Sequence, residues 1–257
     1  MKLGKYYMNW LKLQLRNICQ IKITDIFKRN HEKTTMQKIP SINNGKLPNE
    51  HYNAMLGFWL PTDTPYGNFS LKLMKISSRV DEVNRAIAEV YTSWEIINAN
   101  QMLPIGLYDK HVFATEKAVY HMRRLCDELI SLIWCLSRWE SGNGVWPVKI
   151  VTDSIGGALN PKMDDLAILE VFKKHESILL TLNEISNAFK HSFINTDHSL
   201  LGKVEPCVHA LGLKKNALAS DTEFYNVAMF QLVTDFDKMY QDAFGWLKVF
   251  SSRSIKK

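Results

Sequence analysis

Four long stretches of this sequence carry apolar side chains at helical spacing, and this pattern constrains the fold more than any other feature. In the third stretch, Ile168, Phe172, Leu179 and Leu182 fall on one stripe at about 100° per residue, while the opposite side is polar. Four amphipathic helices of similar length give an all-α fold, a four-to-five-helix up-and-down bundle. The core helices are expected near residues 77–101, 112–140, 161–192 and 222–250.

Candidate capping residues mark the starts of three of these helices. They are Ser77 or Ser78 for the first helix, Asn160 with Pro161 for the third, and the capping box of Ser220 and Glu223 for the fourth. The second helix is expected to end at Gly142-Asn143-Gly144. Residues 145–160 are expected to form a loop, with a short β-hairpin as the alternative.

The rest of the chain divides into a wrapping segment and a basic arm. Residues 36–70 are rich in turn formers, which excludes long regular elements, and their aromatic side chains indicate packing on the helical body. Residues 1–35 hold eight basic and two acidic side chains, so they carry the whole net charge of +6 and leave the remainder neutral. We expect a basic arm or amphipathic helix at 1–35 and a single helical-bundle domain at 36–257.

The sequence lacks the motifs of several common chemistries. Dinucleotide, P-loop, α/β-hydrolase and zincin signatures are missing, and none of the eight histidines follows a Glu by three residues, as a di-iron bundle requires. The four cysteines are too few and too scattered for a disulfide framework or a CxxC metal site, which favours a reducing cytoplasm. No run of 18 apolar residues is present. We expect a cytoplasmic protein with no metal, no cofactor and no transmembrane segment, and we interpret His175 as a hydrogen-bonded core histidine.

One group of side chains near the end of the third helix could carry chemistry. Spacings of three and four residues put Glu184, Asn187 and His191 within a sector of about 60°, away from the apolar stripe, and Lys190 projects from the border of that stripe. A base, an amide and a cation that converge at a helix end could bind phosphate or transfer a proton. The alternative is a solvated helix face whose terminal Lys-His pair suits the helix dipole.

The run Asn187-Ala188-Phe189-Lys190-His191, near one end of a core helix, resembles the HEPN superfamily. This superfamily comprises helical domains linked to nucleotide binding and, in many members, to RNA cleavage. The resemblance covers residues 77–250 as architecture. It implies a homodimer that brings two copies of the motif to a shared cleft.

The motif departs from the ribonuclease members of that superfamily at one position. Those members carry an Arg before the His with four to six residues between, and no such Arg precedes any His of this chain. In a metal-free cut by the RNA 2′-hydroxyl, His acts as general base or acid while Arg stabilises the phosphate transition state. Lys190 and Arg124 are the candidate replacements, although Lys lacks the bidentate fork of Arg.

The resemblance, with the Arg missing, implies a catalytically silent HEPN-like bundle that binds nucleotide, RNA or a protein partner in a defence or toxin–antitoxin setting. Its binding residues would be Lys190, Glu184 and Arg124. The first alternative is a divergent metal-independent endoribonuclease with His191 and Asn187 as catalytic residues. The second is a structural or interaction protein in which Asn187 and His191 brace a neighbouring loop. Enzyme activity is left open, with binding favoured.

Overall fold

A computed structural model describes residues 38–45, 58–99, 105–191, 204–212 and 223–254. The predicted arm at 1–35 lies outside the described residues. Contacts divide the chain into two compact units, Met1–Lys38 and Ile39–Lys257. The described part of the second unit is mostly helical, and it contains a small antiparallel sheet that the all-α prediction did not include. None of the helices in these ranges combines the length and the apolar character needed to cross a bilayer.

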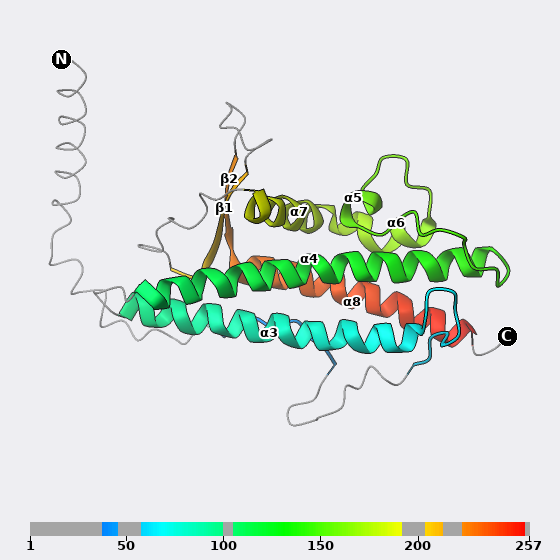
Figure 1. The fold of residues 1–257 in the computed structure, drawn as a ribbon, viewed down its shortest axis with the longest axis horizontal. Helices are drawn as coiled ribbons and strands as arrows, with labels where there is room; N and C mark the ends of the chain where they lie inside the picture. The colour runs from blue at the N-terminus through cyan, green and yellow to red at the C-terminus, as the bar shows by residue number, and fades with distance from the viewer. Residues whose placement is uncertain (1–37, 46–57, 100–104, 192–203, 213–222, 255–257) are drawn as a thin grey trace, which may run out of the picture. The chain divides into compact units, whose positions relative to one another are not determined.

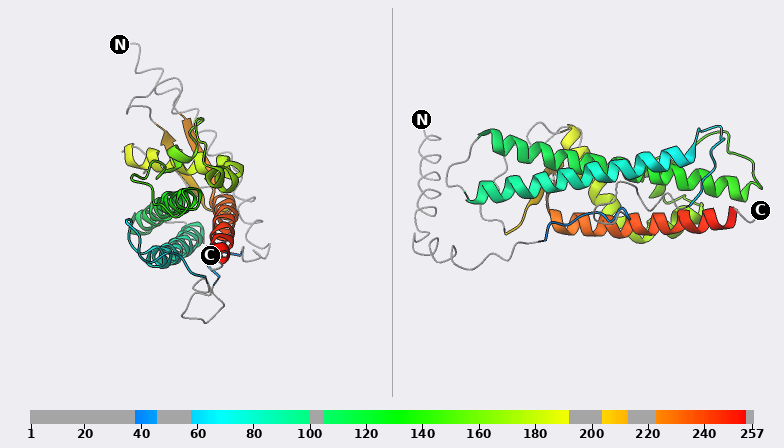
Figure 2. Two further views of the ribbon diagram at one scale, coloured as in Figure 1. Left: turned by 90° about the vertical axis from the view of Figure 1, so that its right-hand side faces the viewer. Right: turned by 90° about the horizontal axis from the view of Figure 1, so that it is seen from below.

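Three long helices lie side by side in this unit (Figure 1, Figure 2). α3 (Phe69–Ala99) and α4 (Ile105–Ser141) run antiparallel, and α8 (Met229–Ser254) runs parallel to α4. Shorter helices lie over α4, and they are α5 (Ile155–Ala158), α6 (Leu166–Phe172) and α7 (Glu176–His191). The apolar sides of these helices meet in one core cluster of buried side chains.

α3 begins at Phe69 instead of Ser77, because Asn68 acts as its cap. The Oδ1 atom of Asn68 accepts a backbone N–H of the first turn at 2.9 Å. The predicted caps lie inside the helix, where Ser78 Oγ donates to the Met74 carbonyl at 3.0 Å. The helix thus starts at the end of the turn-rich segment, which contains no long element in its described residues up to 68.

α4 starts earlier than the predicted 112–140 and ends where the sequence indicates. The N–H groups of Gly142 and Gly144 each donate to a carbonyl of the last turn, both at 2.9 Å. Asn143 and Gly144 have φ values of 52° and 88°, a conformation that glycine adopts readily and asparagine tolerates. Of the loop predicted at 145–160, residues 145–154 are irregular and form no hairpin, but the short helix α5 interrupts the rest at Ile155–Ala158.

The predicted third helix, 161–192, is wrong in its start and in its continuity. α6 ends at Phe172, a 3₁₀ turn spans Lys173–His175, and α7 follows. Asp165 caps α6 in place of Asn160, since its Oδ1 accepts two backbone N–H groups of the first turn at 3.1 and 3.2 Å. The side chain of Asn160 instead closes a turn, accepting the N–H two residues further on at 2.9 Å.

His175 fastens this 3₁₀ turn to α8. Its Nε2 lies 2.7 Å from Oδ2 of Asp242, and Lys174 Nζ lies 3.0 Å from the same oxygen. The predicted hydrogen bond is therefore present. The His175 side chain is 13% exposed, so the residue stands at the edge of the core.

The predicted fourth helix, 222–250, begins later because its first residues form a strand. β1 (Cys207–Gly212) and β2 (Glu223–Ala228) pair antiparallel, with Cys207 opposite Ala228 and Gly212 opposite Glu223. The Phe, Tyr and Val residues of β2 favour a strand, and α8 starts at Met229. Glu223 therefore belongs to the sheet and not to a capping box, while Ser220 lies outside the described residues. β1 lies against α7.

Residues 38–45, which we call the strap, join α3 to α8. Ile42 is 2% exposed, and its N–H and carbonyl both bond the Asn84 side chain of α3, at 2.8 and 3.0 Å. Asn44 Nδ2 donates to a backbone carbonyl of α3 at 3.0 Å, and Tyr240 Oη of α8 donates to Asn44 Oδ1 at 3.1 Å. The described part of the predicted wrapping segment thus packs on the helical body.

Candidate functional site

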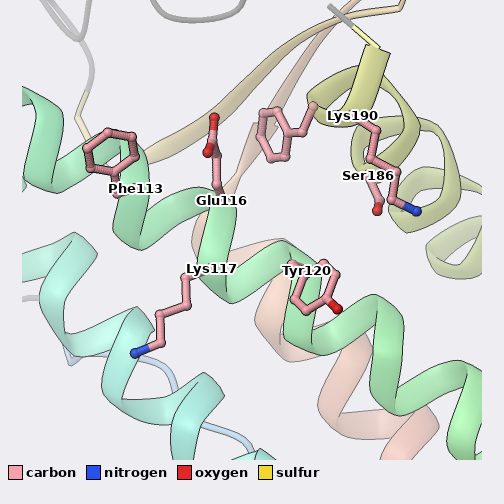
Figure 3. A pocket seen from close by; sticks show the side chains of 7 residues that line it. Phe113, Glu116, Lys117, Tyr120, Ser186 and Lys190 are labelled. Carbon is pink, nitrogen blue, oxygen red and sulfur yellow. The ribbon is translucent and has the colours of Figure 1, made fainter.

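The end of α7 that carries the predicted motif lies over the first half of α4 (Figure 1). Between the two helices is a cavity of about 290 Å³. Its described lining consists of Phe113, Glu116, Lys117 and Tyr120 from α4 and of Ser186, Phe189 and Lys190 from α7 (Figure 3). We call this cavity the α4–α7 groove.

Two aromatic rings of the groove are open to solvent. Phe113 is 64% exposed and Tyr120 is 53% exposed. They are seven residues apart with Glu116 between them, so all three side chains share one face of α4 (Figure 3). Large aromatic side chains are mostly buried in folded proteins, and exposed rings gathered on one face are typical of a contact surface.

The charged side chains of the groove differ in their partners. Lys117 Nζ lies 3.5 Å from Oε2 of Glu82 on α3, and in Figure 3 its amino group points away from Lys190. Glu116 and the exposed Lys190 make no hydrogen bond or ion pair with any other residue in the described ranges. Partial burial raises the pKa of Glu116 above its ordinary value, because the ionised carboxylate loses hydration.

Lys190 is the predicted site residue that the structure places in the groove. Glu184 is exposed and lies near Tyr225 of β2. Burial raises the pKa of the Tyr225 hydroxyl to about 12, and the negative charges of Glu184 and Glu223 add to this effect. Asn187 is half-buried on α7 and does not line the groove. The His191 side chain lies outside the described residues, although its backbone ends α7.

Arg124, the other predicted binding residue, lies on the α3 side of α4. Its Nε donates to Glu128 Oε1 at 3.1 Å, and Arg79 of α3 donates to the same carboxylate at 3.0 and 3.1 Å. The neighbouring Arg123 faces α7, where its Nη2 donates to Asn183 Oδ1 at 3.3 Å. The structure therefore does not bring Arg124 to the motif as a replacement for the missing Arg.

Phe113, Glu116 and Tyr120 were not predicted as site residues, although the sequence holds a signal for them. All three fall outside the apolar stripe of α4, which includes Ala118 and Met122. Two rings on the polar side of an amphipathic helix are unusual and could have been singled out. The sequence could not show that α7 would lie over this side of α4.

The groove can hold a flat, anionic molecule by several kinds of contact. Exposed rings accept stacked bases, Lys190 can neutralise a phosphate, and the Glu116 carboxylate can accept N–H donors. Its described lining contains no histidine, cysteine or arginine. No three His, Cys, Asp or Glu side chains within the described ranges are grouped to hold a metal ion.

A second polar cluster lies buried between α3 and α4. His111 is 2% exposed, and its Nδ1 lies 3.0 Å from Ser93 Oγ and 3.2 Å from the Val90 carbonyl oxygen. Because a carbonyl only accepts, we assign the proton to Nδ1. Burial lowers the pKa of His111 to about 4, so the ring is neutral at neutral pH. This sealed position indicates a structural role in holding the two helices together.

Comparison with known proteins identifies no relative: no protein-family model, no curated protein and no solved structure matches the chain. The resemblance to the HEPN superfamily therefore depends on the motif residues and the helical pattern of the sequence.

Proposed function

We propose that the chain is a HEPN-like up-and-down helical bundle that binds RNA or a free nucleotide in the α4–α7 groove without cleaving it. The observation that carries the proposal is the pair of solvent-exposed rings, Phe113 at 64% and Tyr120 at 53%, in one groove with Lys190.

Each part of the groove meets a physical requirement of such binding. Stacking of a base on an exposed ring contributes about 1–3 kcal/mol, and it tolerates any base because every base has a flat face. A lysine beside a phosphate adds charge attraction and releases counterions. Since residues 36–257 are neutral overall, this attraction must come from local groups such as Lys190. The volume of about 290 Å³ is near the lower limit of small-ligand sites and suits a single nucleotide.

The absence of cleavage is proposed from the positions of Arg123 and Arg124 on α4, neither of which lines the groove. RNA cleavage through the 2′-hydroxyl needs a fixed cation at the phosphate in the transition state. Arg124 is engaged with Glu128, and Arg123 pairs with Asp127 on its own helix. Lys190 remains, and it supplies a point charge without the bidentate fork of Arg.

The test of binding is fluorescence anisotropy with a labelled single-stranded oligouridine. Phe113→Ala and Tyr120→Ala should each weaken binding about tenfold or more, since each removes one stacking surface. The matched control is Trp59→Ala, because Trp59 is an aromatic residue of similar exposure, 48%, that lies outside the groove. Its backbone N–H donates to Ser251 Oγ near the C-terminal end of α8. Unchanged affinity in both groove variants would contradict the proposal.

The test of catalytic silence is incubation of the purified chain with a mixed RNA pool. We expect intact RNA from the wild type. Cleavage by the wild type that His191→Ala abolishes would replace this proposal with the endoribonuclease alternative. Sedimentation of the wild type and of Phe113→Ala and Tyr120→Ala tests self-association separately from RNA binding. A wild-type dimer that dissociates on Phe113→Ala would show that the rings contact a second copy of the chain.

A further inference from the structure

We propose that Glu116 makes the α4–α7 groove select guanine over the other RNA bases, an inference that rests on the proposed function. It concerns the acidic residue of the described groove lining, whose chemistry neither base stacking nor phosphate attraction uses.

The position of Glu116 on α4 places its carboxylate at the edge of any base stacked in the groove. It follows Phe113 by three residues and precedes Tyr120 by four, so it stands between the two rings on the same face (Figure 3). A base that stacks on either ring lies with its plane against the ring and presents its edge to the neighbouring side chain. Lys190, from α7, remains for the phosphate.

Within the described ranges, no donor bonds the carboxylate of Glu116, which is half-buried. The carboxylate lines the groove together with Phe113, Phe189 and Tyr120. Its neighbour Lys117 lies beside Glu82 of α3 instead. The carboxylate oxygens of Glu116 are not among the sealed, unpartnered polar atoms of the described residues, so they stay within reach of water. A ligand that brings N–H donors can replace that water at a carboxylate that burial has already partly desolvated.

Guanine is the RNA base that satisfies both carboxylate oxygens at once. Its Watson–Crick edge carries N1–H and an N2 amino hydrogen side by side, which match the two oxygens as parallel charge-assisted hydrogen bonds. Adenine and cytosine each place a ring-nitrogen lone pair beside their amino donor, and uracil places two carbonyls beside its single N–H. Those lone pairs repel a carboxylate, so the same residue that attracts guanine rejects the other bases.

The experiment is an anisotropy titration of the full chain with four oligonucleotides that are uridine throughout except for one central base. The wild type should bind the guanine oligonucleotide roughly ten- to a hundredfold more tightly than the other three, the discrimination expected of one bidentate base contact. Glu116→Gln should lose that preference while it keeps the affinity for uridine. Glu170→Gln, an exposed change on α6 outside the groove, should keep the preference.

Inosine in the central position tests the two-bond geometry, because inosine keeps N1–H and lacks the N2 amino group. Its oligonucleotide should bind between those of guanine and uridine, and binding equal to guanine would overturn the bidentate contact. Far-UV circular dichroism confirms that Glu116→Gln is folded. If no oligonucleotide binds the wild type, the proposed function itself fails. If all four bind equally and Phe113→Ala weakens them all, the function stands and the selection of guanine is wrong.

Discussion

At the scale of single residues, the sealed histidine between α3 and α4 makes stability depend on pH. The pKa of His111 is about 4 in the folded chain, against an ordinary value of 6.5, because burial disfavours the charged ring. Between these two pH values the unfolded chain binds a proton that the folded chain does not. Stability is therefore greatest above pH 6.5 and falls as the pH drops towards 4.

We predict a loss of up to about 3 kcal/mol from this one group across that range. Urea unfolding at several pH values measures it, and His111→Gln should flatten the slope even if the variant is less stable at neutral pH. His121→Gln should flatten the slope less, because the pKa of the half-buried His121 is also lowered, by partial burial and by Arg79 beside it, but the ring is not sealed as His111 is. An equal pH slope in the wild type and His111→Gln would contradict the prediction.

The residue scale also shows what the sequence could indicate about the groove. Helical spacing put Lys190 at the border of the apolar stripe, and in the structure its side chain is exposed. The prediction named Arg124 and not its neighbour Arg123, which differs from it by about 100° of rotation. That choice depends on which neighbour each side of α4 meets, and only the packed structure determines it.

At the scale of elements, the start of α6 offers a direct comparison of a predicted cap with the observed one. Asp165 is 3% exposed, accepts two N–H groups of the first turn and forms an ion pair with Arg138, with Nε and Oδ2 at 3.0 Å. We predict that Asp165→Ala lowers the free energy of unfolding by about 1–2 kcal/mol. Asn160→Ala should cost less than about 0.5 kcal/mol, because Asn160 is exposed. Chemical denaturation measures the free energy of unfolding of both variants. Equal decreases would contradict the assignment of Asp165, and not Asn160, as the cap.

The interruption of the predicted third helix and the late start of the fourth were missed for reasons of geometry and length. A 3₁₀ turn of three residues rotates the chain by about 60° more than three α-helical residues do, so the apolar stripe continues across Lys173–His175 with little change. Periodicity therefore predicted one helix where there are two. β2 has six residues, which are too few to distinguish a helical from an extended pattern of apolar side chains. The Ser-x-x-Glu match was coincidental, and its Glu223 is the first residue of β2.

At the scale of the whole molecule, the strap connects parts of the chain that are distant in sequence. Asn44 is 5% exposed, and its Nδ2 donates to Ser77 and to Asp81 on α3, while its Oδ1 accepts from Tyr240 on α8. One side chain thus serves several buried polar groups on two helices. Removing it leaves those groups with fewer partners in a place that water does not reach.

We predict that Asn44→Ala lowers the free energy of unfolding by about 2–3 kcal/mol, as expected when a buried hydrogen-bonding group is lost. Asn43→Ala is the matched control, since Asn43 bonds α8 through its backbone N–H and carbonyl, which the substitution retains. It should cost less than about 1 kcal/mol. Urea unfolding followed by tryptophan fluorescence measures the two variants, and similar losses would show that the Asn44 side chain has no special role.

The strap also sets an order of events during synthesis. The bonds from Asn43 to Asp237 and from Tyr240 to Asn44 span 194 and 196 residues. A ribosome releases the strap long before it makes α8, whereas Asn84 follows Ile42 by only 42 residues. The nascent chain can therefore dock the strap on α3 early, but its contacts with α8 must wait until the Met229–Ser254 segment has left the ribosome. Closure of the strap over α8 thus comes after its docking on α3.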